Sequence, residues 1–172
     1  MIQIREATQH DLPQLLEIYN DVILHTTAIY YYEPHTLEMR RAWFEEKMQQ
    51  GIPVFVADED GKILGFSTLG PFRAPAAYKY SAENTVHVAS AARGRGIGKL
   101  LMKPLIDTAF KLQMHTIIAG IDATNEVSLK LHKKFGFVEV AHFKQVGFKF
   151  GKWLDLKFLQ LMLPTPDKPV DG

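Results

Sequence analysis

The spacing of apolar residues along the chain predicts eleven secondary-structure elements. Apolar residues that alternate with polar ones, such as Ile2 and Ile4, predict strands, and apolar residues three or four positions apart predict helices. The predicted strands are residues 2–4, 53–57, 62–69, 86–88, 116–121, 137–143 and 153–163, and the predicted helices are residues 8–23, 36–51, 96–112 and 125–134. The resulting order is β-α-α-β-β-β-α-β-α-β-β, which favours a mixed sheet with helices on both faces.

Local signals mark several boundaries between these elements. Thr8 stands three residues before Asp11, as in the capping box that starts many helices. The acidic run 58–61 ends in glycine between two apolar runs and predicts a hairpin turn. Residues 70–82 contain two prolines and no consistent period, so we expect a loop there. Pro104 lies inside a predicted helix, and we expect a bend at that point because an interior proline removes a helical hydrogen bond.

Composition narrows the class of protein. A chain of 172 residues, 47% of them hydrophobic, has the size of one domain, which we place at residues 1–163, with a flexible, proline-containing tail at 164–172. The net charge of +1 argues against binding to nucleic acid. No apolar run is long enough for a membrane span, and the N-terminus lacks a signal-peptide pattern, so the expected location is the cytoplasm. The absence of cysteine excludes thiolate catalysis, and the spacing of the seven histidines predicts no metal site.

A glycine-rich segment carries the clearest chemical signal. Gly94, Gly96 and Gly98 stand at alternate positions between a predicted strand and a predicted helix. Glycine backbone can adopt left-handed angles, and the first N–H groups of a helix have no partner within the helix, so such a segment can bind an anion. Arg93, Arg95 and Lys99 add positive charge. The segment therefore predicts a phosphate site, and most simply a diphosphate site.

The glycine spacing distinguishes between kinds of phosphate ligand. A nucleotide P-loop requires glycine five positions before the glycine that precedes its lysine, and a dinucleotide loop requires a third glycine one residue later than Gly98. The spacing that fits is [QR]-x-x-G-x-[GA], with Arg93, Gly96 and Gly98 at its fixed positions. This segment resembles the loop that binds the acyl-CoA pyrophosphate in the GNAT superfamily of N-acetyltransferases.

The resemblance extends from Ile4 to about Leu163. Within the superfamily the chain is similar to the branch of phosphinothricin and methionine sulfoximine acetyltransferases. The segments that carry this similarity are Ile18-Tyr19-Asn20, Thr26-Thr27-Ala28, Phe72-Arg73, Ala77-Tyr78, Ala119-Gly120-Ile121, Leu131-His132 and residues 147–155. The resemblance implies the GNAT fold, with a central, mostly antiparallel sheet of about seven strands, and a homodimer.

The resemblance also implies two sets of binding residues. Acetyl-CoA would be the co-substrate, held by Val86, His87, Val88, Arg93, Gly94, Arg95, Gly96, Ile97, Gly98, Lys99, Asn125 and Ser128. A small amino-acid acceptor would lie against Phe72, Arg73, Ala74, Pro75, Tyr78, Glu83, Asn84 and Thr85. The acceptors that the branch implies are phosphinothricin, methionine sulfoximine and methionine sulfone, which connects it with herbicide resistance.

Acetyl transfer requires a base that removes a proton from the amine and an acid that protonates the departing thiolate. Glu83 matches a glutamate of the branch and is the predicted base, with a solvated loop carboxylate as the alternative. His132 stands where many superfamily members have the tyrosine that protonates the departing thiolate, and either His132 or water could do so. Arg73 suits a bidentate pair with the acceptor's carboxylate, although it could be an exposed loop arginine.

Other functions remain open at this point. The enzyme could acetylate another small amine or a peptide N-terminus, or the chain could be a module that senses acyl-CoA without turnover. Tyr30, Tyr31 and Tyr32 could cover the acceptor site or lie in a dimer interface, and Trp153 could line the acceptor pocket or belong to the core.

Overall fold

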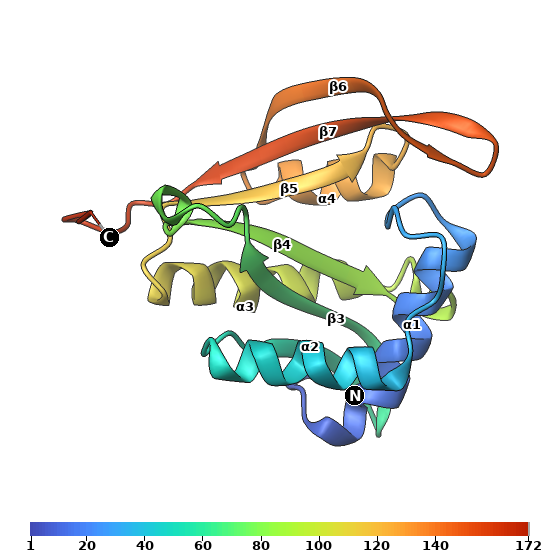
Figure 1. Ribbon diagram of the computed structural model, residues 1–172. Coiled ribbons are helices and arrows are strands. Elements are labelled where there is room, and N and C mark those ends of the chain that lie inside the picture. Colours follow the sequence, from blue (N-terminus) through green and yellow to red (C-terminus); the bar gives the residue numbers. More distant parts are fainter. Residues whose placement is uncertain (172) are drawn as a thin grey trace. The chain divides into compact units, whose positions relative to one another are not determined.

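The computed structural model describes residues 1–171 and contains every predicted element in the predicted order (Figure 1). The strands are β1 (Ile2–Glu6), β2 (Val54–Glu59), β3 (Lys62–Pro71), β4 (Ser81–Val88), β5 (Thr116–Asp122), β6 (Val138–Lys149) and β7 (Lys152–Met162). The helices are α1 (Leu12–His25), α2 (Leu37–Gln49), α3 (Ile97–Lys111) and α4 (Glu126–Lys134), with short 3-10 turns at Gln9–Asp11, Ala76–Tyr78 and Ser90–Ala92. The strand order is β1-β2-β3-β4-β5-β7-β6, and of the strand pairs described below only β4 and β5 run parallel. The prediction of a mixed, mostly antiparallel sheet of seven strands is thus confirmed.

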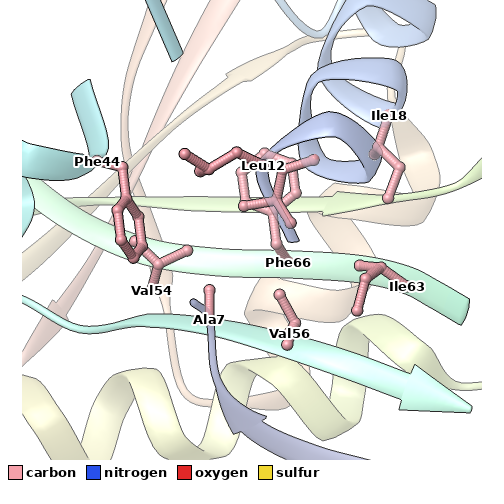
Figure 2. Packing of buried hydrophobic residues seen from close by; sticks show 9 residues of the cluster. Ala7, Leu12, Ile18, Phe44, Val54, Val56, Ile63 and Phe66 are labelled. Carbon is pink, nitrogen blue, oxygen red and sulfur yellow. The ribbon is translucent and has the colours of Figure 1, made fainter. Parts of the chain in front are cut away.

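The chain forms two compact units, and β4 contributes residues to both. The first unit comprises residues 1–69 and 85–106, and the second comprises residues 70–84 and 107–172. In the first unit β1, β2 and β3 pair antiparallel. One face of these strands packs against α1 and α2, and Figure 2 shows Leu12 and Ile18 of α1 together with Phe44 of α2 over the side chains of β2 and β3. The buried members of this cluster are Ala7, Leu12, Leu15, Ile18, Phe44, Val54, Val56, Ile63 and Phe66.

The opposite face of the same strands packs against α3. Ala57 and Leu64 are adjacent in sequence to Val56 and Ile63 and therefore point to the other side of the sheet. They form a second buried cluster with Ile97 and Leu101 of α3. Within the first unit, helices consequently cover both faces, as the strand pattern predicts.

The start of α1 is fixed by a charged cluster. The Asp11 carboxylate accepts hydrogen bonds from the Thr8 backbone N–H at 2.7 Å and from the Thr8 hydroxyl at 3.0 Å. Arg5 of β1 donates to both oxygens of Asp11 at 2.8 Å and pairs with Asp58 of β2 at 2.9 Å. The capping box read from Thr8 and Asp11 is therefore present, and it also connects the helix start to two strands.

The second unit contains the first half of β4 followed by β5, β7 and β6. Ser81, Ala82 and Glu83 of β4 pair in parallel with Thr116, Ile117 and Ile118 of β5. β5 pairs antiparallel with β7, and β7 pairs with β6 in a long hairpin that Figure 1 shows in orange and red. Helix α4 lies beside β5, and Asn125 caps it by accepting the Ser128 N–H at 3.1 Å.

Three sequence expectations need correction. The predicted loop at 70–82 is shorter, because β3 continues to Pro71 and β4 begins at Ser81, with Phe72 N–H donating to Ser81 O at 3.4 Å. Strand β6 continues to Lys149, because its irregular pairing with β7 resumes at Gly147 beyond a break in register. Trp153 is 61% exposed and packs on Phe148, so it is not a core residue. Helix α3 runs through Pro104, and the bend expected there stays a prediction.

The C-terminal residues contact the second unit. Thr165 donates its hydroxyl to Met114 O at 2.6 Å, and its carbonyl lies 2.8 Å from His115 Nδ1. Val170 N–H donates to the Tyr80 hydroxyl at 3.1 Å. The flexibility predicted for residues 164–172 stays a prediction, and Gly172 lies outside the described residues. None of the helices found in residues 1–171 has the length and apolar character of a membrane span.

The Asp11 cluster predicts a specific acid sensitivity. The bonds from Arg5, followed by those from Thr8, lower the pKa of Asp11 from 3.8 to about 2. Because this pKa is depressed in the folded state, ionised Asp11 stabilises the fold above pH 3.8, and the contribution is lost as the pH falls toward 2. We expect Asp11→Asn to lower the free energy of unfolding by about 2 kcal/mol at pH 7.

Urea unfolding of the wild type and of Asp11→Asn at pH 7, 5 and 3 measures this contribution. The difference between the two proteins should fall by roughly half between pH 5 and pH 3, as the wild-type carboxylate begins to lose its advantage. The matched control is Asp60→Asn, because the Asp60 side chain is 86% exposed. A difference that does not change with pH would show that the pair contributes through packing and not through charge.

Candidate active site

The glycine-rich loop and the start of α3 have the backbone that an anion site requires. Gly94 and Gly96 adopt left-handed φ angles of +80° and +78°, which disfavour other residues. Gly96 O accepts the N–H groups of Lys99 and Leu100 at 3.0 and 3.2 Å, so the helix begins directly after this glycine. A Cβ at either of the two glycines would meet nothing within 4 Å. The glycines are therefore required by the backbone angle, and the loop is open to a ligand.

Some side chains around this loop are engaged by other residues of the protein, and others are exposed cations. Ile97 is 1% exposed and packs with Leu101, so only its backbone is available to a ligand. Arg95 donates to both carboxylate oxygens of Glu59, at 2.7 and 3.1 Å, and its charge is therefore shared with that residue. Arg93 and Lys99 are exposed. The positive charge offered to a diphosphate thus comes mainly from these two side chains and from the helix N-terminus.

The second half of β4 belongs to the same unit as the loop. Val86 and Val88 pack with the α3 cluster, whereas the His87 ring lies on the other face, against Tyr19 and Phe66. Burial, followed by the charge of Arg40, lowers the pKa of His87 to about 4, so this imidazole is neutral at pH 7. The side chains of these three residues are therefore engaged in packing, and the backbone is what remains for a cofactor.

Glu83 lies in the first half of β4, in the second unit. The side chain is partly buried, and this burial raises the pKa of its carboxyl, while the charge of Arg73 opposes the rise. A carboxylate with a raised pKa holds a proton more readily than an exposed one, which is a property of catalytic bases.

Gly120 of β5 makes room for the Glu83 side chain. A Cβ at position 120 would lie 3.3 Å from Glu83 Oε1 and 3.2 Å from the Phe158 ring. Contacts that close would force the carboxylate or the ring to move. Gly120 belongs to a segment that carries the family resemblance, but only the tertiary structure shows that its absent side chain is what matters.

Asn84 and His132 form a hydrogen-bonded pair in the second unit. Asn84 Nδ2 lies 2.8 Å from His132 Nε2, and His132 Nδ1 lies 2.8 Å from the carbonyl oxygen of Ser128. A carbonyl oxygen can only accept, so Nδ1 carries the proton and Nε2 accepts from the Asn84 amide. His132 is 4% exposed, and burial lowers its pKa, although the bond to Ser128 opposes this. The imidazole is therefore neutral, and its one proton is held by a backbone carbonyl.

The remaining predicted residues of the second unit lie at the start of α4 and in the loop before β4. The Oδ1 atom of Asn125 caps α4, so its amide nitrogen is the group that can face a ligand. Arg73 is exposed, with its guanidinium 5.1 Å from the Phe72 ring, and Phe72 also packs edge to face on Tyr78. Ala74 and Pro75 are exposed in the same loop. No group of three acidic or histidine side chains within residues 1–171 is placed to hold a metal ion.

Sequence reasoning missed a cavity of about 240 Å³ in the first unit. Its most unusual wall residue is Arg40 of α2, which is 2% exposed. Arg40, Trp43, Phe44 and Lys47 stand at i, i+3, i+4 and i+7, so they share one helical face. Two cations on the apolar face of a helix are a signal that could have identified this site. The residues that line the cavity are Tyr19, Tyr31, His35, Met39, Arg40, Trp43, Phe66 and Thr85.

Comparison with known proteins places the chain in a family. The sequence-family model described as an acetyltransferase (GNAT) domain matches residues 4–157. An L-methionine sulfoximine/L-methionine sulfone acetyltransferase from Salmonella typhimurium is 40% identical over 96% of this chain and 97% of its own length. A phosphinothricin N-acetyltransferase from Streptomyces coelicolor is 38% identical over 92% of this chain and 95% of its own length.

A solved structure gives the same result for the fold. The crystal structure of a GNAT superfamily phosphinothricin acetyltransferase from Sinorhizobium meliloti, in complex with acetyl-CoA, has a TM-score of 0.94 at 33% identity. The match covers 99% of this chain and 94% of that one. With the open glycine loop before α3 and relatives that match over nearly their whole length, this chain belongs to the GNAT acetyltransferase family and is an acyltransferase.

Proposed function

We propose that this enzyme transfers the acetyl group of acetyl-CoA directly to the α-amine of a small amino-acid analogue. The acceptor class is an amino acid with an oxidised sulfur or phosphorus in its side chain, such as methionine sulfoximine, methionine sulfone or phosphinothricin. The observation that carries the proposal is the partly buried Glu83, whose pKa is raised, in the electrostatic field of Arg73. The names and full-length coverage of the relatives support the same acceptor class.

Acetyl-CoA would bind through backbone groups more than through side chains. The N–H groups at the start of α3 and the left-handed glycines Gly94 and Gly96 suit the pyrophosphate, with Arg93 and Lys99 beside them. The register of β4 with β5 ends at Glu83, whereas β4 itself continues to Val88. The N–H and C=O groups of residues 86–88 that face away from β3 are suited to hydrogen bonds with the pantetheine arm, as strand edges accept an extended ligand.

Glu83 would accept a proton from the acceptor's ammonium group, directly or through water. The α-amine of an amino acid has a pKa of about 8, so most of the substrate arrives protonated at neutral pH and cannot attack the thioester carbonyl. A base whose pKa is raised toward neutrality accepts that proton more readily than an ordinary carboxylate. The neutral amine then attacks the thioester carbonyl and the nitrogen loses its second proton to water. The carbon–sulfur bond breaks, and CoA leaves as the thiolate.

The hydrogen bonds of His132 favour water as the proton source for this thiolate. The single imidazole proton of His132 is held by Ser128 O, and Nε2 accepts from Asn84. Protonation of the thiolate by His132 would require both bonds to rearrange. We therefore assign His132 a positioning role, in which it orients the Asn84 amide on the strand that carries Glu83.

Arg73 is the proposed partner of the acceptor's α-carboxylate. Its guanidinium is exposed on a loop with the aromatic rings of Phe72 and Tyr78, where a planar carboxylate can form two parallel hydrogen bonds with it. The carboxylate would then lie near the residue that deprotonates the neighbouring amine.

A homodimer is proposed from the apolar surface of the β6–β7 hairpin. Phe148 and Trp153 pack edge to face with ring centroids 5.1 Å apart, yet they are 47% and 61% exposed. Large apolar side chains clustered on an exposed surface are a common mark of a protein interface. The other exposed apolar residues of this hairpin are Val138, Val140, Phe143, Val146 and Phe150.

The acceptor class is tested by the release of free thiol from acetyl-CoA. We expect CoA release with methionine sulfone, methionine sulfoximine and phosphinothricin, and at least about tenfold lower kcat/KM for simple amines that lack a carboxylate, because they cannot pair with Arg73. The chain has no cysteine, so a thiol reagent reports only CoA. Release with peptides or simple amines alone would replace the proposed acceptor. Binding of acetyl-CoA without release with any amine would indicate a sensor.

The base role of Glu83 is tested by the pH dependence of Glu83→Gln. At pH 7 we expect kcat to fall by about 10²-fold or more, because the amide cannot accept the proton. The rate should recover partly toward pH 9, where the acceptor amine loses its proton without assistance. In the wild type, activity should rise with pH through the raised pKa of Glu83, and this rise should be absent from the pH profile of the variant.

Glu17→Gln, at an exposed position of α1, is the control for Glu83→Gln. Parallel pH profiles for the wild type and the variant would remove Glu83 from this role.

The dimer is tested by sedimentation of the wild type and of Trp153→Glu. The wild type should sediment at twice the chain mass of 19.5 kDa, and the variant should shift toward the monomer because a buried carboxylate would be unpaired in the interface. Met48→Lys changes an apolar residue that is 44% exposed on α2 and should leave the mass unchanged. A wild type that sediments as a monomer at high concentration would refute the interface.

A further inference from the structure

The cavity in the first unit is held in shape by α1 and α2. Tyr19 comes from α1, and Arg40 and Trp43 come from α2. The wall formed by His35 is fixed by Asn20, whose Nδ2 donates to His35 O at 2.9 Å and whose Oδ1 accepts the His35 N–H at 2.8 Å. At about 240 Å³ the cavity is slightly smaller than the pockets that hold drug-sized ligands, and it suits part of an amino acid.

Arg40 is a buried cation without an anion. Its guanidinium carbon lies 3.9 Å from the centroid of the Tyr19 ring and 4.4 Å from that of Trp43. Its Nε atom has no hydrogen-bond acceptor within residues 1–171, and no carboxylate in that range forms an ion pair with it. Burial of a charge without a charged partner is costly, and aromatic faces compensate only part of that cost.

Lys47, the second buried cation of α2, has the hydrogen-bond acceptor that Arg40 Nε lacks. Lys47 lies two turns further along the same helical face and is also buried, at 6% exposed. Its ammonium group donates to the carbonyl oxygen of Leu69 at 2.6 Å. Lys47 is thus satisfied by the fold itself. The fold supplies no oxygen to Arg40 Nε, and the Arg40 side chain is one wall of the cavity.

The groups around Arg40 carry no negative charge, although the Tyr19 side chain forms a hydrogen bond with it. Burial raises the pKa of Tyr19, so the phenol stays protonated, and burial lowers the pKa of both His35 and His87, so the imidazoles stay neutral. The cavity therefore offers one positive charge and aromatic walls. An ammonium group would be repelled there, whereas a group that carries partial or full negative charge on oxygen would be attracted.

We propose that the Arg40 cavity is the subsite for the side-chain oxygens of the acceptor, and thus the specificity determinant of the enzyme. The inference rests on the proposed function, because Thr85, which the resemblance assigns to the acceptor, is also a wall of this cavity. The acceptors in question share a tetrahedral sulfur or phosphorus with oxygen attached. The guanidinium donates to that oxygen, and the rings of Tyr19 and Trp43 contact the attached methyl and methylene groups.

The charge of Arg40 also disfavours an ammonium group in the cavity. The side-chain oxygen of the acceptor is drawn toward Arg40. A substrate that entered in reverse would bring its ammonium group to a cation. Arg40 thus selects an amino acid with an oxidised side chain over one with an unmodified thioether.

The test compares methionine sulfone with methionine as acceptors of wild type and Arg40→Met. The two substrates share the amine, the carboxylate and the chain length, and they differ only in the sulfone oxygens. We expect Arg40→Met to lower kcat/KM for methionine sulfone about tenfold or more and to change that for methionine by less than about threefold, so that the preference collapses. Arg41→Met, at an exposed position of the same helix, should preserve the preference.

Two further measurements separate specificity from folding. The melting temperature of Arg40→Met should equal or exceed that of the wild type, because the variant replaces a cation without an anionic partner by an apolar side chain of similar length. The KM for acetyl-CoA should stay the same. Arg40→Lys keeps the charge without the planar donor group, and it should retain part of the preference.

The other outcomes distinguish a failure of the Arg40 subsite from a failure of the proposed function. Equal losses for methionine and methionine sulfone would show that Arg40 serves a group common to both, such as the carboxylate, and would overturn the subsite. A lower melting temperature with equal losses would assign Arg40 to the fold, and an unchanged preference would remove it from recognition. If Arg40 has no role but the wild type acetylates methionine sulfone, the proposed function stands. If the wild type acetylates neither amino acid, the proposed function itself fails.

Discussion

The alternation of side chains along β4 is the constraint on which the chemistry of this enzyme depends. Successive residues of a strand point to opposite faces, so Glu83, Thr85 and His87 share one face, and Asn84, Val86 and Val88 share the other. A shift of one residue would exchange the two sets completely. The parallel pairing of Glu83 with Ile118 fixes this register in the second unit, and the packing of Val86 and Val88 with α3 fixes it in the first. One strand thereby carries the base, a wall of the Arg40 cavity and the backbone proposed for the cofactor.

Burial controls the protonation of Glu83, His87 and His132. It raises the pKa of Glu83 and lowers the pKa of His132 and of His87. The two histidines are consequently neutral and serve as hydrogen-bonding or packing groups, while the carboxylate becomes a better proton acceptor. Arg40 is the exception, because an arginine stays charged even when it is buried. Its charge is a permanent feature of the cavity, which makes it suitable for recognition and unsuitable for proton transfer.

Much of the fold could be read from local signals. Thr8 caps the 3-10 turn that leads into α1, Asn125 caps α4, and Gly61 lies in the turn between β2 and β3. These signals are reliable because the hydrogen bonds and backbone angles behind them involve residues only a few positions apart. The misjudged parts depend on partners that are distant in sequence. The full length of β6 follows from its pairing with β7, and the exposure of Trp153 follows from its place in that hairpin.

Some features of the candidate site follow from local sequence, and others follow from contacts between residues distant in sequence. The sequence by itself determined the glycine loop, because left-handed angles at Gly94 and Gly96 and a helix that starts directly after them are local properties. It determined the identity of the family, since the motifs are spread along nearly the whole chain. Only the tertiary structure decided that His132 is held by Asn84 and Ser128, that Gly120 leaves room for Glu83, and that Arg40 lies beside a cavity. The physical reason is that burial, and with it the protonation or the charge of a side chain, is set by neighbours that the fold brings together from remote positions.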